Sequence, residues 1–188
     1  STTACLVHVD TDGTLRALNL GDSGFRVFRS EGGGSSDRLA LFRASSAQQH
    51  EFNFPLQLGT GSSSKPADGD VYCDTLRPGD LLLLATDGVF DNLHDEELSQ
   101  LLGKCGGSRS AADLASEVAS SAQKAGYSRT GRTPFSVGAS QAGLDMPGGK
   151  LDDVAVICVR VLDEAGATAA EESERCSSFV LPSLQSKL

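Results

Sequence analysis

Short apolar, β-branched runs separated by turn-forming residues dominate the first half of the chain. Residues 5–9 and 15–20 flank Asp10-Thr11-Asp12-Gly13, a composition typical of a hairpin turn. Further runs of the same kind occupy residues 25–29 and 39–43. Four short strands in succession predict an antiparallel sheet.

The most apolar run lies at residues 81–85, Leu-Leu-Leu-Leu-Ala, and is apolar enough to be buried on both faces. The sequence Arg-Pro-Gly-Asp at residues 77–80 predicts a tight turn that pairs residues 71–76 with this strand. The strand ends on Asp87-Gly88. A carboxylate followed by glycine at a strand end is typical of a simple turn, but it also suits a hard cation.

The pattern changes to a helical period after Asp87. Three acidic residues at 95–97 suit the positive end of a helix dipole, and leucines at helical spacing predict a helix that ends at Gly103. Ser110 followed by Asp113 resembles a capping box, and apolar residues at helical spacing continue to Gly126. The sequence therefore predicts a short helix and a longer one.

Two long polar segments, residues 44–70 and 128–150, are expected to be loops because they lack periodic apolar positions. The second loop carries Asp152 to the start of a closing strand at residues 154–161. Residues 163–188 mix Ala, Glu and Ser without a period and predict a disordered tail. The chain thus divides into one domain at residues 1–162 and a tail at residues 163–188.

The overall composition is that of one compact domain. Sixteen basic and twenty-five acidic residues among 188 give a net charge of −9, which argues against nucleic-acid binding and against attraction to anionic membranes. The longest apolar run is far shorter than the roughly eighteen residues that span a bilayer. Five scattered cysteines favour neither a disulfide framework nor a zinc site, so an intracellular, reducing location is expected. The sequence shows no targeting leader and leaves the organelle and the oligomeric state open.

Aspartates stand at the ends of three predicted strands. Besides Asp87, Asp22 follows residues 15–20 in a glycine-rich turn, and Asp152-Asp153 precede the closing strand. These carboxylates could converge, although Asp22 and Asp153 could also only cap turns. Aspartates without a histidine cluster favour Mg²⁺ or Mn²⁺ over Zn²⁺.

Three other possible sites do not fit the sequence. A calcium loop beginning at Asp10 needs glutamate at its twelfth position, where Gly21 stands. Residues 143–150 lack the glycine and Ser/Thr positions of a phosphate-binding loop. His50 is expected to pack or hydrogen-bond locally rather than to act in acid/base catalysis.

Five short motifs follow one another along the chain. They are Asn-Leu-Gly-Asp-Ser-Gly at residues 19–24, Gln48-Gln49-His50 with residues 52–58, Ala-Thr-Asp-Gly-Val-Phe-Asp-Asn-Leu at residues 85–93, Thr-Pro-Phe-Ser at residues 133–136, and residues 148–156 around Asp152-Asp153. Together they resemble the metal-dependent serine/threonine protein phosphatases of type 2C, particularly their small mitochondrial and plastid members. They occur in the order found in that family and cover roughly residues 1–161.

The resemblance implies an α/β fold, a type 2C phosphatase-like β-sandwich flanked by helices. It implies hydrolysis of phosphoserine and phosphothreonine on phosphoprotein substrates by a water that a binuclear Mg or Mn centre activates, with no membrane insertion. Asp87 and Asp152 would be direct metal ligands, and Asp22 with Asp87 would hold a third metal. Gly88 and Gly21 would support the site, as would Asp153, which stands where most relatives have asparagine.

One part of the family pattern has no counterpart in this sequence. The family carries an earlier Asp-Gly-Val-Gly-Gly type segment, whose aspartate bridges both metals, and a basic residue that grips the phosphate. The resemblance therefore covers the C-terminal two-thirds of such a domain, and these 188 residues alone are expected to be inactive, with weak metal binding. The alternative function is that of a non-catalytic pseudophosphatase or protein-binding fragment.

Overall fold

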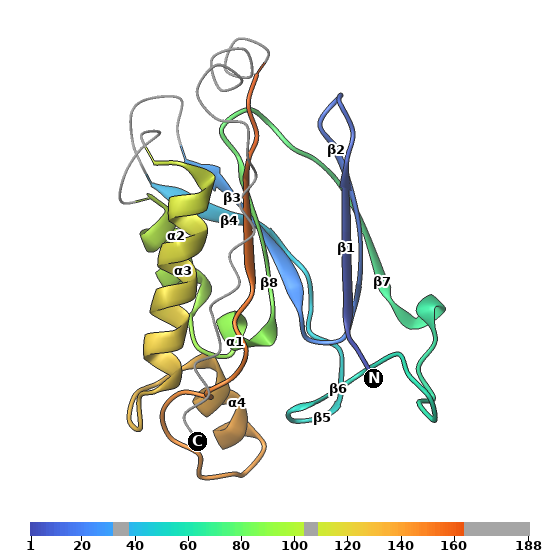
Figure 1. Cartoon of the computed structure of the whole chain (residues 1–188), viewed down its shortest axis with the longest axis vertical. Coiled ribbons are helices and arrows are strands. Elements are labelled where there is room, and N and C mark those ends of the chain that lie inside the picture. The colour runs from blue at the N-terminus through green and yellow to red at the C-terminus, as the bar shows by residue number, and fades with distance from the viewer. Residues whose placement is uncertain (32–37, 104–108, 164–188) are drawn as a thin grey trace, which may run out of the picture.

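The computed structural model describes residues 1–31, 38–103 and 109–163. Two β-sheets face each other, and helices cover the outer face of the second sheet, so the chain forms three layers (Figure 1). The fold is α/β, a sandwich flanked by helices, as the sequence predicts. No helix in these ranges is long and apolar enough to cross a membrane.

The first sheet has the order β1-β2-β7, and the second has the order β4-β3-β8-β9, with all neighbours antiparallel. A small hairpin of two further strands lies apart from both sheets. The strands are β1 (Ala4–Val9), β2 (Thr14–Leu20), β3 (Gly24–Ser30), β4 (Leu39–Ala44), β5 (Gln49–Glu51), β6 (Phe54–Pro55), β7 (Asp70–Thr75), β8 (Leu81–Ala85) and β9 (Val156–Arg160).

The helices follow β8 in the sequence, apart from one short 3-10 helix before β7. They are η1 (Pro66–Asp68), α1 (Asp87–Phe90), α2 (Asp95–Gly103), α3 (Ala111–Gly126) and α4 (Pro134–Gln141). The capping box predicted at Ser110 and Asp113 is present, and α2 and α3 span the predicted helices.

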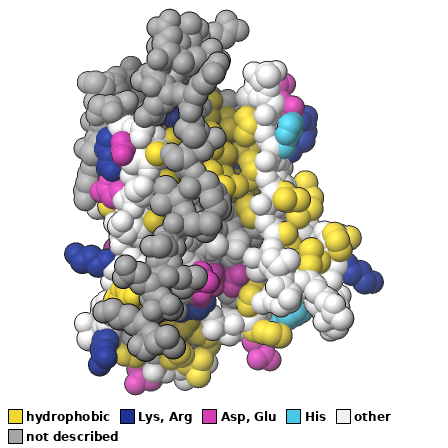
Figure 2. All heavy atoms as spheres, in the orientation of Figure 1, with side chains coloured by type: hydrophobic (Ala, Val, Ile, Leu, Met, Phe, Trp, Pro, Cys, Tyr) yellow, Lys and Arg dark blue, Asp and Glu magenta, His cyan; other side chains and the backbone are white. Residues whose placement is uncertain are grey.

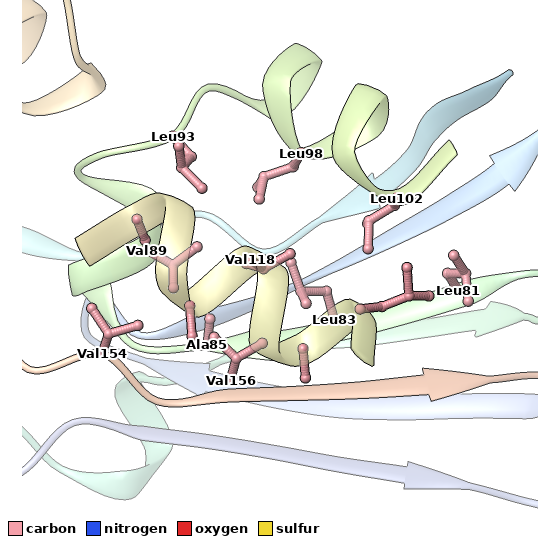
Figure 3. Close-up of a cluster of buried hydrophobic side chains, with 14 of the residues drawn as sticks. Leu81, Leu83, Ala85, Val89, Leu93, Leu98, Leu102, Val118, Val154 and Val156 are labelled. Carbon is pink, nitrogen blue, oxygen red and sulfur yellow. The ribbon is translucent and has the colours of Figure 1, made fainter. Parts of the chain in front are cut away.

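The core lies on both sides of β8. One cluster fills the space between the sheets and includes Leu15, Phe25 and Leu82. The other joins the second sheet to the helices, where Val118 of α3 lies close to Leu83 of β8 (Figure 3). Because β8 has packed layers on both faces, its near-continuous apolar sequence is explained.

Two predictions of strand pairing are wrong. Residues 71–76 do not pair with β8; β7 pairs with β2, while β8 lies between β3 and β9. A strand that is apolar on both faces must lie in the central layer, whereas four of the six β7 residues are exposed and suit an outer sheet. The first four strands also form no single sheet, since the turn at Gly21, with φ of 98°, passes the chain from one sheet to the other.

Two predicted loops contain regular structure. Residues 44–70 include β5, β6 and η1, and residues 128–150 include α4. Helix α4 starts where Thr133 Oγ1 accepts a hydrogen bond from Ser136 N, with Pro134 at the first helical position. The predicted tail lies almost wholly outside the described residues, so the division at residue 162 stays a prediction.

Candidate metal centre

The end of β8 and the start of β9 bring two predicted ligands to one place. Ala85 and Val156 are paired neighbours in the sheet, and Asp87 and Asp152 lie just beyond them. Thr86 fastens the two segments together: its hydroxyl donates to Asp153 O at 2.9 Å and accepts from Ala155 N at 3.1 Å. Asp87 begins helix α1, so its carboxylate extends from the first turn.

Gly88 allows the close approach of these two segments. A Cβ atom at this position would lie 2.5 Å from the carbonyl oxygen of Asp153, a distance that side chains do not tolerate. Any larger residue would therefore push Asp152 and Asp153 away from Asp87. This contact gives a physical reason for a glycine beside the predicted ligand.

Asp22 comes to the same place from the turn between the two sheets. It lines a cavity of about 480 Å³ together with Thr86, Asp87, Lys150, Asp152 and Asp153. Gly21 is tightly packed, since a Cβ there would lie 2.4 Å from the Thr3 side chain. In the space-filling view, acidic side chains are visible at several separate places on this face, some of them below its middle (Figure 2).

A lysine lies among the carboxylates. Lys150 Nζ is 2.7 Å from Asp87 Oδ2, 2.9 Å from Asp91 Oδ2 and 3.0 Å from Asp152 Oδ2. Its side chain is 18% exposed, so these ion pairs are largely shielded from water. One ammonium group therefore faces three carboxylates at contact distance, with Asp22 in the same cavity.

Asn92 holds the lysine backbone in place. The Asn92 amide Nδ2 donates to Lys150 O at 2.7 Å and to Gly88 O at 2.9 Å, and its Oδ1 accepts from Lys150 N at 2.9 Å. Asn92 is 2% exposed, so these bonds form in the interior. The buried amide thus ties α1 to the segment that carries Asp152.

The charges of the cluster shift the pKa values of its members. Partial burial and the negative charge of Asp87 raise the pKa of Asp22 to about 6. Burial raises the pKa of Asp91 despite its hydrogen bond with Lys150. Burial acts in the same direction on Asp152, but the hydrogen bonds from Lys150 and from Asp153 N outweigh it and lower the pKa of Asp152. The cluster has too little positive charge for its carboxylates.

The surrounding carboxylates also shift the pKa of Lys150. Burial alone would lower its pKa, yet the hydrogen bonds to Asp87 and Asp91 raise it well above the ordinary value for lysine. The group is therefore a permanent cation at any physiological pH.

The remaining predicted residues take less specific positions. Asp153 lines the cavity, and its backbone forms two hydrogen bonds: its N–H donates to Asp152 Oδ1 at 2.9 Å, and its carbonyl oxygen accepts from Thr86 Oγ1. His50 lies outside the cavity lining and packs against Phe54, with ring centroids 5.4 Å apart. This contact agrees with the local packing expected for His50.

The sequence reading did not identify Asp91 and Lys150. Asp91 stands four residues after Asp87, a spacing that places both side chains on one face of a helix, but α1 is too short to show a period. No local signal marks Lys150, because its position depends on the path of the whole segment before β9.

The donor set fits a hard divalent cation. Every candidate ligand is a carboxylate oxygen, the type that Mg²⁺ and Mn²⁺ prefer. Carboxylate oxygens of three aspartates already surround one positive charge, the ammonium of Lys150. Within the described ranges, no group of three or more His, Cys, Asp or Glu side chains is arranged to hold a metal by itself. Here the aspartates converge on Lys150.

Comparisons with known proteins agree on one family. No family model matches the chain. It is 38% identical over 161 residues to the probable protein phosphatase 2C 55 of Arabidopsis thaliana, covering 84% of this chain and 32% of that protein. It is 38% identical over 168 residues to the human protein phosphatase PTC7 homolog, covering 84% of this chain and 53% of that protein.

Solved structures show the same relationship. The photosystem II phosphatase PBCP superimposes with a TM-score of 0.73 at 25% identity, covering 85% of this chain and 63% of that chain. The catalytic domain of the phosphatase PstP, solved with two manganese ions, shares the fold with a TM-score of 0.53 at 18% identity, covering 86% of this chain and 58% of that chain. The chain is therefore similar over most of its length to type 2C protein phosphatases, and it spans about a third to a half of the length of these two curated relatives.

Proposed function

We propose that this protein hydrolyses phosphoserine and phosphothreonine on proteins with a water activated by Mg²⁺ or Mn²⁺. The observation that carries the proposal is the convergence of Asp87 and Asp152, from separate strand ends, around one cation position in a cavity. The relatives are named protein phosphatases, which favours catalysis over a non-catalytic binding role.

The residues have distinct parts in this proposal. Asp87 and Asp152 hold the metal centre, and Asp22 with Asp87 holds a further, weaker cation. Bound there, two hard cations would lower the pKa of a bridging water and neutralise charge on the phosphoryl oxygens. Thr86 and Gly88 keep the two ligand segments together through their contacts with Asp153.

The cavity lining argues against a covalent mechanism. The residues around it include hydroxyl groups, such as Ser23 and Thr86, but no histidine and no cysteine. A serine or threonine nucleophile needs an adjacent base for activation, and Lys150 is held protonated by its ion pairs with Asp87 and Asp152. Direct attack by water fits this lining better.

The shape of the cavity fits a phosphoprotein substrate, and the cysteines fit an intracellular location. The cavity is open and polar, as a phosphoprotein side chain requires, and the free thiols of Cys5, Cys73 and Cys158 are consistent with an intracellular location.

The test is turnover of a phosphothreonine peptide by the full-length native protein. We expect hydrolysis in millimolar Mn²⁺ or Mg²⁺ and none in excess EDTA, with recovery when Mn²⁺ is restored. Undiminished turnover in EDTA would show that the chemistry does not depend on a metal.

A further inference from the structure

Lys150 occupies the point where a metal would have to bind. Its Nζ lies within 3.0 Å of carboxylate oxygens of Asp87, Asp91 and Asp152. Two of these residues are the metal ligands of the proposed function. An ammonium group and a divalent ion seek the same oxygens, and their like charges repel at this separation. The two cations therefore compete.

The lysine backbone is fixed independently of its ammonium group. Asn92 bonds both Lys150 N and Lys150 O. Gly149 packs against the end of α3 so closely that a Cβ there would lie 2.1 Å from Ala125 O. The side chain is a flexible four-carbon stem, so the ammonium can move while the backbone and the aspartates stay in place.

The ammonium already lies near a second attractive group. The ring of Phe135, on α4, has its centroid 5.9 Å from Nζ in the present position. An aromatic face attracts an ammonium group within about 6 Å. A shift of the flexible stem toward this ring would therefore leave the ammonium with a partner after a metal takes the carboxylates.

We propose that Lys150 is an internal counter-cation, which holds the carboxylates together in the metal-free protein and which a divalent ion must displace. Lys150 thereby sets the Mn²⁺ concentration at which the site fills. This inference rests on the proposed function, because it takes Asp87 and Asp152 as metal ligands. Lys150 is a positioning residue in this account, since it acts through the aspartates.

A purely structural role for Lys150 predicts the opposite result. If the ion pairs only kept the site in shape, their loss would disorder the ligands and weaken metal binding. If the ammonium competes with the metal, its loss removes a competitor and strengthens metal binding. The direction of the change separates the two roles.

The first experiment measures Mn²⁺ binding by calorimetry in the full-length protein and three variants. We expect Lys150→Met to lower the dissociation constant about tenfold or more, because it removes one positive charge from contact with the ligands. Lys150→Arg keeps the charge and should bind within about threefold of wild type. Lys124→Met removes a charge from the exposed last turn of α3 and should have no effect. Equal or weaker Mn²⁺ binding by Lys150→Met would overturn the proposal.

The second experiment needs no variant and decides the matter even if Lys150→Met does not fold. Wild-type protein is acylated briefly with an amine reagent, in EDTA or in saturating Mn²⁺, and each lysine is quantified by mass spectrometry. We expect Lys150 labelling to rise at least threefold in Mn²⁺, with Lys124 unchanged as the internal reference. Unchanged or reduced labelling of Lys150 would show that the metal does not displace it.

These measurements separate failure of this inference from failure of the proposed function. Neither depends on phosphatase turnover. Mn²⁺ binding that is unaffected by Lys150→Met overturns the counter-cation role alone. A wild-type protein that binds no Mn²⁺ overturns both.

Discussion

Strand β8 carries an aspartate just before its first residue and another shortly after its last, and the two lie in opposite electrostatic environments. Asp80 is 1% exposed and forms a bidentate pair with Arg29, at 2.9 Å from Nε and 2.7 Å from Nη2. It also accepts a hydrogen bond from Arg77 N at 2.8 Å. Asp87 instead shares the single ammonium of Lys150 with Asp91 and Asp152.

The comparison shows how charge balance separates a structural aspartate from a candidate functional one. At Asp80 one carboxylate meets one guanidinium, and the hydrogen-bonding capacity of both is well used, so the site needs no further ion. At Asp87 the carboxylates outnumber the cations. Burial, and to a smaller extent the negative charge of Asp87, raise the pKa values of Asp22 and Asp91. Burial differs in the same sense, since the side chain of Asp80 is 2% exposed and that of Asp87 is 23% exposed.

The largest effect is expected on stability, from removal of the Asp80 carboxylate that pairs with Arg29. Asp80→Ala leaves the guanidinium of Arg29 largely buried without its carboxylate, which should lower the free energy of unfolding by about 3 to 5 kcal/mol. Chemical denaturation in urea measures this, and Mn²⁺ affinity should not change. A loss below about 1 kcal/mol would mean that water or Thr75 O satisfies Arg29.

The next largest effect is expected from Asp87 and Asp152, on turnover rather than on stability. Asp87→Asn and Asp152→Asn each remove a ligand charge, and each should reduce turnover of a phosphopeptide about 100-fold or more, about 2.7 kcal/mol in the barrier. The unfolding free energy should change by less than about 1 kcal/mol, because repulsion is relieved as the bond to Lys150 is lost. Asp145→Asn, outside the cavity lining, is the control. Near-wild-type rates in saturating Mn²⁺ would show that the ligands are misassigned.

Mn²⁺ should raise the free energy of unfolding only when Asp87 is present. At a free Mn²⁺ concentration ten times the dissociation constant, binding adds about 1.4 kcal/mol to the unfolding free energy. We expect this increase in wild type, its removal by EDTA, and its absence in Asp87→Asn. Thermal unfolding with and without Mn²⁺ measures it, and an equal increase in Asp87→Asn would place the bound ion elsewhere.

The smallest effect concerns Asp22 in the metal-free protein. Its pKa of about 6 is above the ordinary value, so the folded state binds a proton more readily than the unfolded state. The charged form costs stability above pH 6, and this cost disappears as the pH falls toward 4. Asp22→Asn in EDTA should therefore be more stable than wild type by about 1 kcal/mol at pH 7.5, after allowance for solvent screening. A difference that does not shrink between pH 6 and pH 4 would contradict this.

Local sequence patterns predicted the positions of strands and helices better than they predicted which strands pair. The buried strand β8 and the capped helix α3 follow from apolar periodicity and from the Ser110 cap, which are properties of neighbouring residues. The pairing of β7 could not be read in the same way, because a strand's partner depends on which layers cover its faces. Helix α4 is an intermediate case, since Thr133 and Pro134 provide a start signal that the surrounding glycines obscure.

The candidate site was predicted in part for the same reason. Strand ends indicated Asp87, Asp152 and Asp22, and the structure brings all three to one cavity, although their role as ligands stays a prediction. Lys150 and Asp91 depend on tertiary position. Nothing in the sequence around Lys150 shows that its ammonium reaches two carboxylates of the α1 segment as well as Asp152 on its own segment.

The buried amide of Asn92 makes the spacing of the two ligand-bearing segments independent of the length of the turns between them. By bonding Gly88 O and both backbone groups of Lys150, it fixes the distance between the two ligand-bearing segments from within the site. The chain that joins these segments, residues 93–149, is therefore not what sets their spacing. An insertion at the exposed turn of Gly143, where a Cβ meets nothing within 4 Å, should lengthen the connection without moving the site. In evolutionary terms, we expect the turn at Gly143 to tolerate changes in length while the metal centre keeps its geometry.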